Sequence, residues 1–408
     1  GRRNAGAKAL TMPRVLSLST LFPNAANPRF GTFVARSLEA LQRETDWDVT
    51  VVNPIGLPPL PNALLPGRYR VLAAAATGGI ENGISVHRPR FTLLPKIGGR
   101  LNPGAIARAA LPLIRHLHAK TPFDLVDAQF FYPDGSAAVR IARALDLPLS
   151  IKARGADIHY WGSRSYARDA MLAAGSDAKG LLSVCEALAD DMTALGLPRD
   201  KIAIHYTGLD RDRFRPFDHT RLRSRVGTEF DIALPDDAPL LVTVGALIPR
   251  KGQRLVIEAL TSLPDARVLL VGKGEDEADL RALAQTLGLA DRTHFLGSID
   301  HDLLPLVLSA ADAMVLPSSS EGLANAWVEA LACGTPLVIT DAGGAREVVD
   351  GPDAGIIVAR EAEAIADGIK LVLAHPRSPH TVAAKAERFD WRVNGRTLGE
   401  YYERLVRA

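Results

Sequence analysis

Residues 316–337 read LPSSSEGLANAWVEALACGTPL, and this stretch decides the fold. The apolar residues 313–316 predict a buried strand, the small polar residues after it predict a turn, and a helix then runs until Gly334 and Pro336 end it. Another apolar strand is expected directly afterwards, at residues 337–340. A strand, a helix and a second strand in this order form the repeating unit of a parallel sheet covered by helices.

The same alternation continues along the chain, whose length is 408 residues. In the first half it predicts strands at residues 15–19, 49–53, 85–88, 125–129, 149–152, 180–184 and 202–206, and helices at 31–44, 103–119, 135–145 and 186–195. In the second half it predicts strands at residues 240–245, 267–271, 293–296, 313–316, 337–340 and 355–357. The pattern is that of an α/β protein with two doubly wound parallel sheets.

The length also favours two or three domains. We expect a disordered leader at 1–11, a first doubly wound domain at 12–207, a polar linker at 208–216, a second domain at 217–390 and a terminal helix at 391–408. Residues 54–83 are rich in Pro, Gly and Ala, and we interpret them as a long loop with a broken helix.

Composition narrows the class of protein. Net charge is only +2, so nothing demands a nucleic-acid partner. No run of eighteen apolar residues predicts a transmembrane helix, and two cysteines far apart favour a reducing compartment, hence a cytoplasmic location. The segment 88–120 holds seven Lys and Arg against no acidic residue. Its helix is best explained as a cover for the sheet, but contact with anionic lipid at the inner face of the cell membrane, or with a lipid-phosphate acceptor, stays open.

Two carboxylates, Glu321 and Glu329, flank the start of the helix, with seven residues between them. A helix N-terminus has free backbone N–H groups and is a natural seat for a phosphate. Since a carboxylate repels a phosphate, these glutamates make better sense as acceptors for sugar hydroxyls. Alternatively, Glu321 interacts with the helix dipole and Glu329 is a solvent-facing residue of the helix. The turn therefore favours a phosphorylated sugar.

A second group of residues follows the strand that ends in Gly245. The loop presents Arg250 and Lys251 before Gly252 and a helix start. Ligands of open α/β sheets bind beyond the carboxyl ends of strands. Arginine offers a planar fork to a phosphate, and lysine a mobile point charge. A solvated surface pair is the alternative, but the position at a strand end favours diphosphate binding.

Other loops are less specific. Gly272-Lys-Gly274 follows a strand but lacks the third glycine of a dinucleotide motif, so we interpret it as a tight turn lining the same site. Two Asp-x-Asp pairs, at 210/212 and 300/302, are better explained by capping than by a metal. In the first half, the Gly31 turn, the segment 129–135 and Arg154-Gly-Ala-Asp157 also lie past strand ends. Arg154 and Asp157 could simply pair with each other, although a role at a site is favoured.

These residues together resemble one family, the retaining, two-domain GT-B glycosyltransferases of family 4, also called group 1. The resemblance covers nearly the whole chain and rests on its glutamate turn, its Arg-Lys loop, Tyr132-Pro-Asp-Gly, Arg154-Gly-x-Asp157 and the Gly208-Leu-Asp linker. It implies two Rossmann-like domains facing across a cleft, with the last helix returning to the first domain. It also implies a nucleotide diphosphate sugar as donor, with UDP- or GDP-sugars expected first, and neither a metal nor another cofactor.

The resemblance also implies roles for individual residues. Glu321 would contact the donor sugar and Glu329 the ribose. The residues expected to hold or line the rest of the donor are Gly31, Gly245, Arg250, Lys251, Gly272, Gly297, Ile299, Gly322, Leu323, Ala324 and Asn325. Those expected to take part in catalysis are Glu321, Arg250, Lys251 and Asp157, and those on the acceptor side are Gln129, Tyr132 and Arg154.

The chain departs from the family pattern at three positions. Ala246 stands where many members have Arg, so Arg250 must supply that charge. Gln129 and Arg154 stand where histidine is frequent, so no catalytic histidine is carried over. The expected activity is sugar transfer to a glycan or lipid-linked acceptor, in bacterial surface polysaccharide or glycolipid synthesis. A sugar-nucleotide epimerase and a catalytically silent sugar-nucleotide-binding subunit are the alternatives. A pyridoxal phosphate phosphorylase is disfavoured, because no lysine is obviously placed for its Schiff base.

Overall fold

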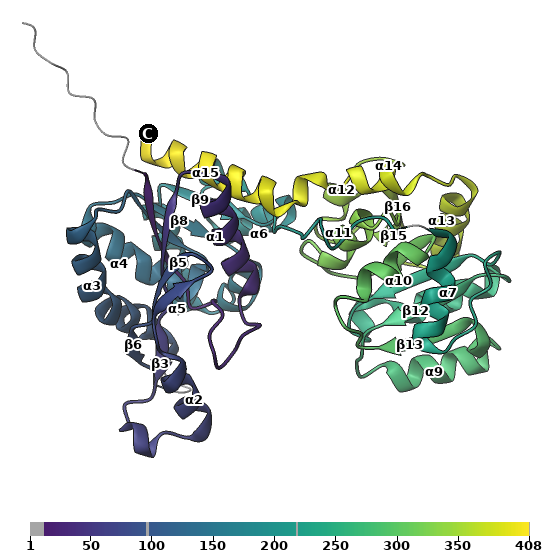
Figure 1. The fold of residues 1–408 in the computed structure, drawn as a ribbon, viewed down its shortest axis with the longest axis horizontal. Coiled ribbons are helices and arrows are strands. Elements are labelled where there is room, and N and C mark those ends of the chain that lie inside the picture. The colour runs from purple at the N-terminus through teal and green to yellow at the C-terminus, as the bar shows by residue number, and fades with distance from the viewer. Residues whose placement is uncertain (1–11, 95–97, 218, 408) are drawn as a thin grey trace, which may run out of the picture. The chain divides into compact units, whose positions relative to one another are not determined.

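The chain forms two compact units in the computed structural model, which describes residues 12–94, 98–217 and 219–407 (Figure 1). The first unit contains the described residues up to Gly208 together with those from Trp391 onward, and the second is Leu209–Asp390. The expected leader at 1–11 lies outside the described residues. Among the described residues, no helix is both long enough and apolar enough to span a bilayer.

The first unit is built on an eight-stranded sheet in the order β10-β9-β8-β7-β1-β2-β5-β4. Neighbouring strands are parallel except β4 and β5. The strands are β1 (Arg14–Leu18), β2 (Asp48–Val52), β4 (Gly79–Glu81), β5 (Ile84–His87), β7 (Leu125–Ala128), β8 (Leu149–Lys152), β9 (Gly180–Ser183) and β10 (Ile202–Ile204). Most of their residues are fully buried, as expected of a parallel sheet covered on both faces.

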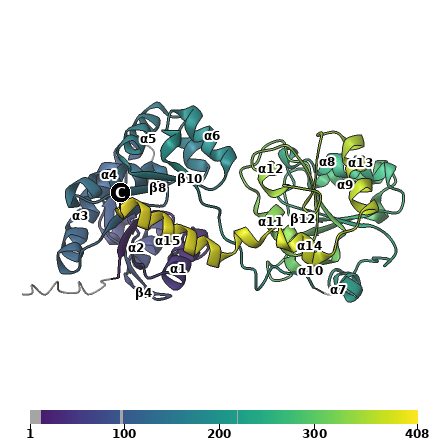
Figure 2. The same cartoon turned by 90° about the horizontal axis from the view of Figure 1, so that it is seen from above.

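The helices of the first unit include the C-terminal one. They are α1 (Thr32–Glu44), α2 (Gly67–Ala75), α3 (Asn102–Lys120), α4 (Ser136–Leu145), α5 (Ser165–Asp177), α6 (Glu186–Leu195) and α15 (Trp391–Arg407). Figure 2 shows α15 beside α1. The ring of Tyr402 on α15 meets that of Trp47, which lies between α1 and β2, edge to face with the ring centroids 5.4 Å apart. The last helix therefore packs in the core of the first unit, although the second unit lies between them in sequence.

Residues 54–83 are more ordered than a long loop with a broken helix, and that expectation was wrong. They hold β3 (Ile55–Leu57), the short helix η1 (Asn62–Leu64), α2 and β4. β3 pairs in parallel with β6 (Arg90–Thr92), another strand that we did not predict, and α5 was missed as well. Three-residue strands carry too little periodicity to be recognised locally, because their pairing depends on a distant partner.

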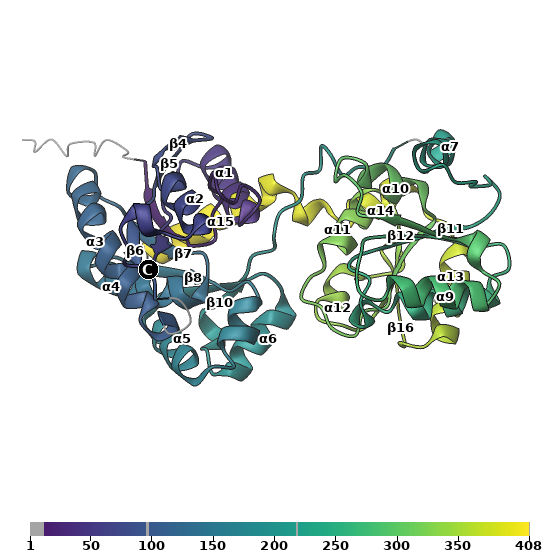
Figure 3. The ribbon, with the colours of Figure 1, turned by 90° about the horizontal axis from the view of Figure 1, so that it is seen from below.

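The second unit has a six-stranded parallel sheet in the order β13-β12-β11-β14-β15-β16. Its strands are β11 (Leu240–Val244), β12 (Arg267–Val271), β13 (Thr293–Gly297), β14 (Ala313–Leu316), β15 (Leu337–Thr340) and β16 (Gly355–Val358). Its helices are α7 (His219–Phe230), α8 (Gln253–Ala259), α9 (Glu277–Thr286), α10 (Leu304–Ala310), α11 (Asn325–Ala332), α12 (Ala345–Val348), α13 (Ala362–Ala374) and α14 (Pro379–Ala384). Figure 3 shows α7 and α10 on one face of the sheet and α9 and α13 on the other.

The segment 208–216, expected to be a linker, largely folds into the second unit. The Leu209 N–H donates to the Phe389 carbonyl at 2.5 Å, and Phe214 is buried. At Gly208, an added Cβ would lie 2.1 Å from the ring of Trp391, so glycine lets that ring pack directly on the backbone. The chain therefore passes between the units at two adjacent points, next to Gly208 and Trp391.

Candidate active site

The candidate site lies where the second sheet changes its winding direction. From β11 the chain first adds strands on one side, β12 and β13, and then returns to add β14, β15 and β16 on the other. The carboxyl ends of β11 and β14 therefore lie side by side, and their loops lead away in opposite directions. Such a switch point is where open α/β sheets bind ligands. The loops after these two strands carry the Arg-Lys pair and the glutamate turn.

The two loops meet in an ion-pair cluster. The Lys251 Nζ lies 2.5 Å from Glu321 Oε1, and an Arg250 Nη1 lies 3.4 Å from Glu321 Oε2. The Lys251 and Glu321 side chains are 13 % and 8 % exposed, whereas that of Arg250 is 45 % exposed. Residues 70 positions apart thus form one charged group. The Glu321 carboxylate thus neutralises the cation expected to bind the diphosphate.

The backbone of the serine turn holds Arg250 in place. The guanidinium of Arg250 donates to the Ser320 carbonyl, and the Ser319 N–H donates to the Arg250 carbonyl at 2.8 Å. Ser318, the first of the three serines in the turn, is buried, and its carbonyl accepts from the Thr340 hydroxyl at 2.5 Å. Hydrogen bonding therefore fixes the buried start of the turn at Ser318, and the turn is exposed to solvent from Ser319 onward.

Arg360 is a residue of the site that sequence reasoning missed. Its Nε donates to the Pro317 carbonyl and its Nη2 to the Pro249 carbonyl, each at 2.9 Å. It therefore joins the loops after β11 and β14, just below the Lys251–Glu321 pair. The signal was present, because Arg360 follows β16 and so lies past a strand end like the other candidates.

Glycine is required where the loops approach each other most closely. Gly252 has φ 77°, and a Cβ there would lie 2.5 Å from the Pro317 carbonyl oxygen. A Cβ at Gly343, with φ 53°, would lie 2.1 Å from the Glu321 carbonyl oxygen. The Gly344 N–H also donates to the Gly322 carbonyl at 2.8 Å. Any side chain at these two positions would push the glutamate turn away from its neighbours.

The three predicted strand-end glycines of the donor side lie on adjacent strands. The Gly245 N–H donates to the Val271 carbonyl at 2.9 Å, and the Gly272 N–H donates to the Gly297 carbonyl at 2.8 Å. Ile299, two residues past β13, is partly exposed. The loops after β11, β12 and β13 thus form a continuous edge leading away from the ion-pair cluster.

The turn before α11 remains accessible. Gly322 and Asn325 are exposed, Leu323 and Ala324 are partly exposed, and the helix is buried from Trp327 onward. The first N–H groups of a helix lack intrahelical acceptors, so this end can receive an anion. The four residues predicted to hold a diphosphate by their backbone thus occupy the open end of a buried helix.

Glu329 lies one turn inside α11 and makes a different contact. Its Oε1 lies 3.3 Å from His301 Nε2, and the Nδ1 of the same ring accepts from Arg213 at 3.0 Å. Because Nδ1 accepts, the ring proton is on Nε2 and points at the carboxylate. Glu329 is only 9 % exposed. Its expected contact with ribose stays a prediction, and His301 is a further polar group beside it that the sequence analysis did not identify.

The acceptor-side residues lie in the first unit and differ from expectation. The Arg154 guanidinium donates to the Gln129 carbonyl at 3.1 Å and to Gln129 Oε1 at 2.5 Å, and it stacks on the Phe33 ring, 4.7 Å from its centre. The side chains of Arg154 and Asp157 therefore do not pair. Gln129 is fully buried, so its side chain orients Arg154 rather than facing a ligand.

Asp157, expected to take part in catalysis, has a structural role in this loop, and its part in catalysis stays a prediction. The carboxylate is fully buried and accepts four backbone N–H groups, from Phe131, Arg154, Gly155 and Ile158, at 2.9–3.2 Å. Three of these N–H groups bond to Oδ1 and one bonds to Oδ2, so backbone groups hold the carboxylate in place. Asp157 thus fixes the loop that carries Arg154.

Tyr132 is likewise buried, and its hydroxyl donates to the Gly99 carbonyl at 2.5 Å. Its ring packs 5.0 Å from that of Trp161. Of the three acceptor-side predictions, Arg154 is the one whose side chain is partly exposed.

A buried basic pair beneath this loop was also missed. The Lys152 ammonium lies 2.6 Å from His205 Nδ1 and 3.0 Å from the His205 carbonyl, and His205 Nε2 lies 2.9 Å from the Asn394 carbonyl of α15. Burial lowers the pKa values of both Lys152 and His205. The pair could not be recognised from sequence, because Lys152, His205 and the Asn394 carbonyl lie in three separate segments.

Among the residues that the structure describes, no group of three or more His, Cys, Asp or Glu could hold a metal ion. The Asp210 carboxylate accepts from the N–H groups of Asp212 and Arg213 at 3.1 and 3.2 Å. The Asp300 carboxylate accepts from the Asp302 N–H at 3.0 Å. The first aspartate of each pair therefore closes a tight turn.

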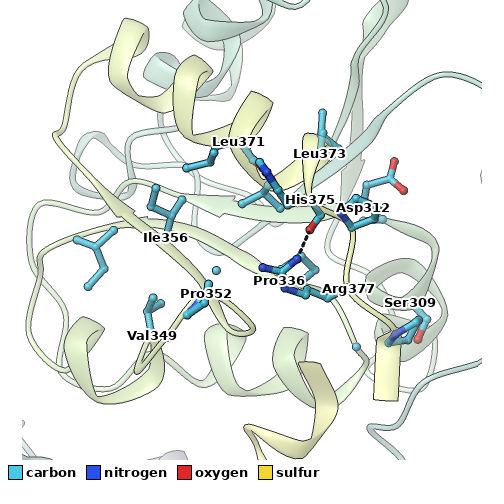
Figure 4. Close-up of a pocket in the computed structure, with 18 residues that line it drawn as sticks. Ser309, Asp312, Pro336, Val349, Pro352, Ile356, Leu371, Leu373, His375 and Arg377 are labelled. Carbon is cyan, nitrogen blue, oxygen red and sulfur yellow. Dashed lines mark hydrogen bonds between the residues drawn. The ribbon is translucent and has the colours of Figure 1, made fainter. Parts of the chain in front are cut away.

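A pocket of about 820 Å³ opens elsewhere in the second unit (Figure 4). It lies at the amino ends of β15 and β16, beside Pro336 and Gly355, and is closed on another side by Leu371 and His375 at the end of α13. The glutamate turn and the glycine loops lie at the opposite, carboxyl edge of the same sheet. None of the predicted donor-binding residues lines this pocket.

Comparison with known proteins agrees with the geometry. Residues 228–389 match the model of the family described as glycosyl transferases group 1, and residues 30–213 match that of glycosyltransferase family 4. TuaC of Bacillus subtilis, a glycosyltransferase named for teichuronic acid biosynthesis, is 28 % identical over 364 residues, covering 87 % of this chain and 88 % of its own. A Mycolicibacterium smegmatis enzyme named as a GDP-mannose-dependent phosphatidylinositol monomannoside mannosyltransferase is 30 % identical, covering 59 % of this chain and 66 % of its own.

Solved structures show the same fold. HepE of Anabaena, in complex with UDP, superposes with a TM-score of 0.68 at 20 % identity, over 96 % of this chain and 100 % of that one. Sucrose-phosphate synthase of Thermosynechococcus elongatus gives a TM-score of 0.68 at 19 % identity, over 96 % and 99 %. The expected GT-B class, with two parallel-sheet Rossmann-like domains, is confirmed. The chain belongs to the group 1 glycosyltransferases of family 4.

Proposed function

We propose that this glycosyltransferase moves a sugar, with retention of configuration, from a nucleotide diphosphate sugar to a glycan or lipid-linked acceptor. The observation that carries the proposal is the ion-pair cluster of Lys251, Arg250 and Glu321 at the switch point, beside the open end of α11. Cations and helix N–H groups suit a diphosphate, and the carboxylate suits the hydroxyls of the attached sugar.

The donor would bind with its diphosphate between Lys251, Arg250 and the turn of Gly322–Asn325. The two cations and the helix end would stabilise the charge that develops on the departing diphosphate, so that no metal is needed. Retention would follow from the leaving diphosphate guiding the acceptor to the sugar face that it vacates. The first unit supplies Arg154, held by Gln129 and Phe33, as the residue expected to face the acceptor.

The named relatives suggest the chemical class of the substrates. HepE has been solved with UDP-glucose, and the name of the mycobacterial enzyme specifies GDP-mannose and a phosphatidylinositol-linked acceptor. We therefore propose a UDP- or GDP-sugar as donor and a role in bacterial surface polysaccharide or glycolipid synthesis. The two cysteines are buried and form no disulfide, which fits a cytoplasmic location.

The first test identifies the donor. Thermal shift with UDP-, GDP-, ADP- and dTDP-sugars, each with and without magnesium, should show one base stabilising the chain without a magnesium requirement. The anomeric configuration of the product, read by NMR, then tests retention. Stabilisation by none of the four would contradict the donor assignment, and an inverted product would contradict the mechanism.

The second test removes the cation. Lys251→Ala should lower turnover by roughly 10²–10³-fold, the scale of one lost oxyanion donor. Lys370→Ala is the matched control, because Lys370 forms an exposed pair with Asp367 on α13. Near-normal turnover of Lys251→Ala, or an equal loss in the control, would refute the assigned role. Interconversion of the sugar nucleotide without transfer would identify an epimerase instead.

A further inference from the structure

A small lobe of the first unit carries more exposed apolar surface than its size requires. We define the α2 lobe as residues 55–76, which contain β3, η1 and α2. Ile55, Leu57, Leu65, Tyr69 and Ala73 form a hydrophobic cluster of its own. Figure 1 shows the lobe projecting from the end of the first unit.

Three apolar side chains of this lobe face solvent. Leu60 is 47 % exposed, Leu64 68 % and Val71 56 %. Since the lobe already has an internal cluster, these three side chains do not contribute to it. An exposed group of large apolar residues on a projecting element marks a contact surface.

The surroundings of the lobe are uniformly basic. Residues 54–94 and 98–123 hold eight Lys and Arg and one acidic residue, whereas the whole chain is nearly balanced at 48 against 46. The single acid, Glu81, pairs with Arg88, which is buried and also donates to the carbonyls of Pro23 and Thr77. Arg88 is therefore a structural residue, and of the basic residues in segment 88–120 it is not available to a ligand.

The remaining cations are exposed. Arg68 and Arg70 lie on α2 beside Val71, and Arg108, Arg115 and Lys120 lie on the outer side of α3. The inner side of α3 is buried through Ile106, Ala110 and Ile114, as expected of a helix that covers the sheet. α3 packs on β6, and β6 pairs with β3 of the lobe, so the helix that carries these exposed cations is joined to the lobe through β6.

We propose that the α2 lobe docks on an anionic lipid bilayer, with Leu60, Leu64 and Val71 in the apolar layer and the arginines of α2 and α3 at the headgroups. A bilayer offers uniform negative charge beside an apolar layer, which this surface matches. A second copy of the chain would bring the same positive charges against themselves, so it is a poorer occupant. The inference does not depend on the proposed reaction and can be tested without a substrate.

The test uses the full chain and vesicles of phosphatidylcholine, with and without phosphatidylglycerol. Flotation should show binding to the anionic vesicles alone, and binding should weaken with added salt. Arg68→Gln with Arg70→Gln should weaken partitioning about 30-fold, at about fivefold for each cation near the surface. Leu60→Gln with Leu64→Gln should weaken it by about tenfold or more.

Matched controls come from the second unit. Arg221→Gln with Arg225→Gln removes two exposed cations from α7, and Leu287→Gln with Leu371→Gln removes two exposed leucines. Both controls should bind anionic vesicles like the wild type. Equal loss in lobe and control variants, or binding that ignores anionic lipid, would overturn the proposal. A dimer in light scattering that the lobe variants abolish would assign the surface to a second copy and overturn it too.

Discussion

The most informative single change is Glu321→Gln, which keeps the shape of the side chain and removes its charge. The Glu321 carboxylate forms an ion pair with Lys251, with 2.5 Å between Glu321 Oε1 and Lys251 Nζ. An incoming diphosphate must displace that carboxylate before it can bind the ammonium. The variant should therefore bind a bare nucleoside diphosphate more tightly than the wild type, even though a residue of the site has been altered.

The size of the gain follows from the burial of the pair. Exposed ion pairs contribute about 0.2–1 kcal/mol, and removing one partner of a buried pair costs about 3–5 kcal/mol. With 13 % and 8 % exposure the pair is largely buried, but Arg250, at 45 % exposure, leaves one side open to water. We take about 1–2 kcal/mol, which corresponds to a gain in affinity of about five- to thirtyfold.

The intact donor should behave differently. If Glu321 also accepts hydroxyls of the sugar, the amide is the weaker acceptor, so the nucleotide sugar should gain less than the bare diphosphate. Turnover should fall by roughly 10²-fold, because a charged contact at the reacting sugar is lost.

Isothermal titration of both ligands into wild type and variant measures these differences. Glu403→Gln is the control, since Glu403 forms an exposed pair with Arg407 on α15, and it should change neither affinity. Weaker binding of the bare diphosphate by Glu321→Gln would refute the displacement argument. An equal gain for both ligands would refute a contact between Glu321 and the sugar.

Three further predictions concern residues that the structure brings forward. Arg360→Gln should lower turnover by about tenfold, because the two hydrogen bonds to the Pro317 and Pro249 carbonyls are lost. Turnover is measured in a kinetic assay, and the control variant Arg346→Gln, which removes an exposed arginine, should turn over like the wild type. Asp157→Asn should destabilise the first unit by about 1–3 kcal/mol, because an amide cannot accept all four N–H groups; a melting transition like the wild type's would contradict this. Burial raises the pKa of Asp134 to about 7. Its native form then holds a proton that the unfolded chain releases, so its stabilising contribution is full below the ordinary pKa of 3.8 and is lost as pH rises through about 7. The melting temperature of the first unit should thus fall less steeply in Asp134→Asn between about pH 5 and pH 7.5, and identical slopes would contradict the assignment.

The sequence was most informative where information is local. Alternating apolar runs and helices predicted six strands of the second unit to within two residues at each end, because burial on both faces imposes a continuous apolar run. Loops after those strands could be named as candidate sites without any structure, since ligands bind beyond carboxyl ends. The missed elements were the short strands β3 and β6, which pair with a distant partner, and the helix α5.

The partners of the charged side chains could not be predicted in this way. Sequence proximity left a pair between Arg154 and Asp157 open as the alternative to a role at a site, but the fold brings Gln129 to Arg154 and four backbone N–H groups to Asp157. It also buries Arg88, which composition alone counted with the exposed cations.

The sequence by itself determined that two parallel sheets form and that Lys251 and Glu321 follow strands of the second one. The tertiary structure alone decided that these two residues touch. Contact between residues 70 positions apart depends on strand order, since β11 and β14 become neighbours only when the chain reverses its winding between them. Strand order is a property of the whole folded sheet, and no local pattern of side chains encodes it.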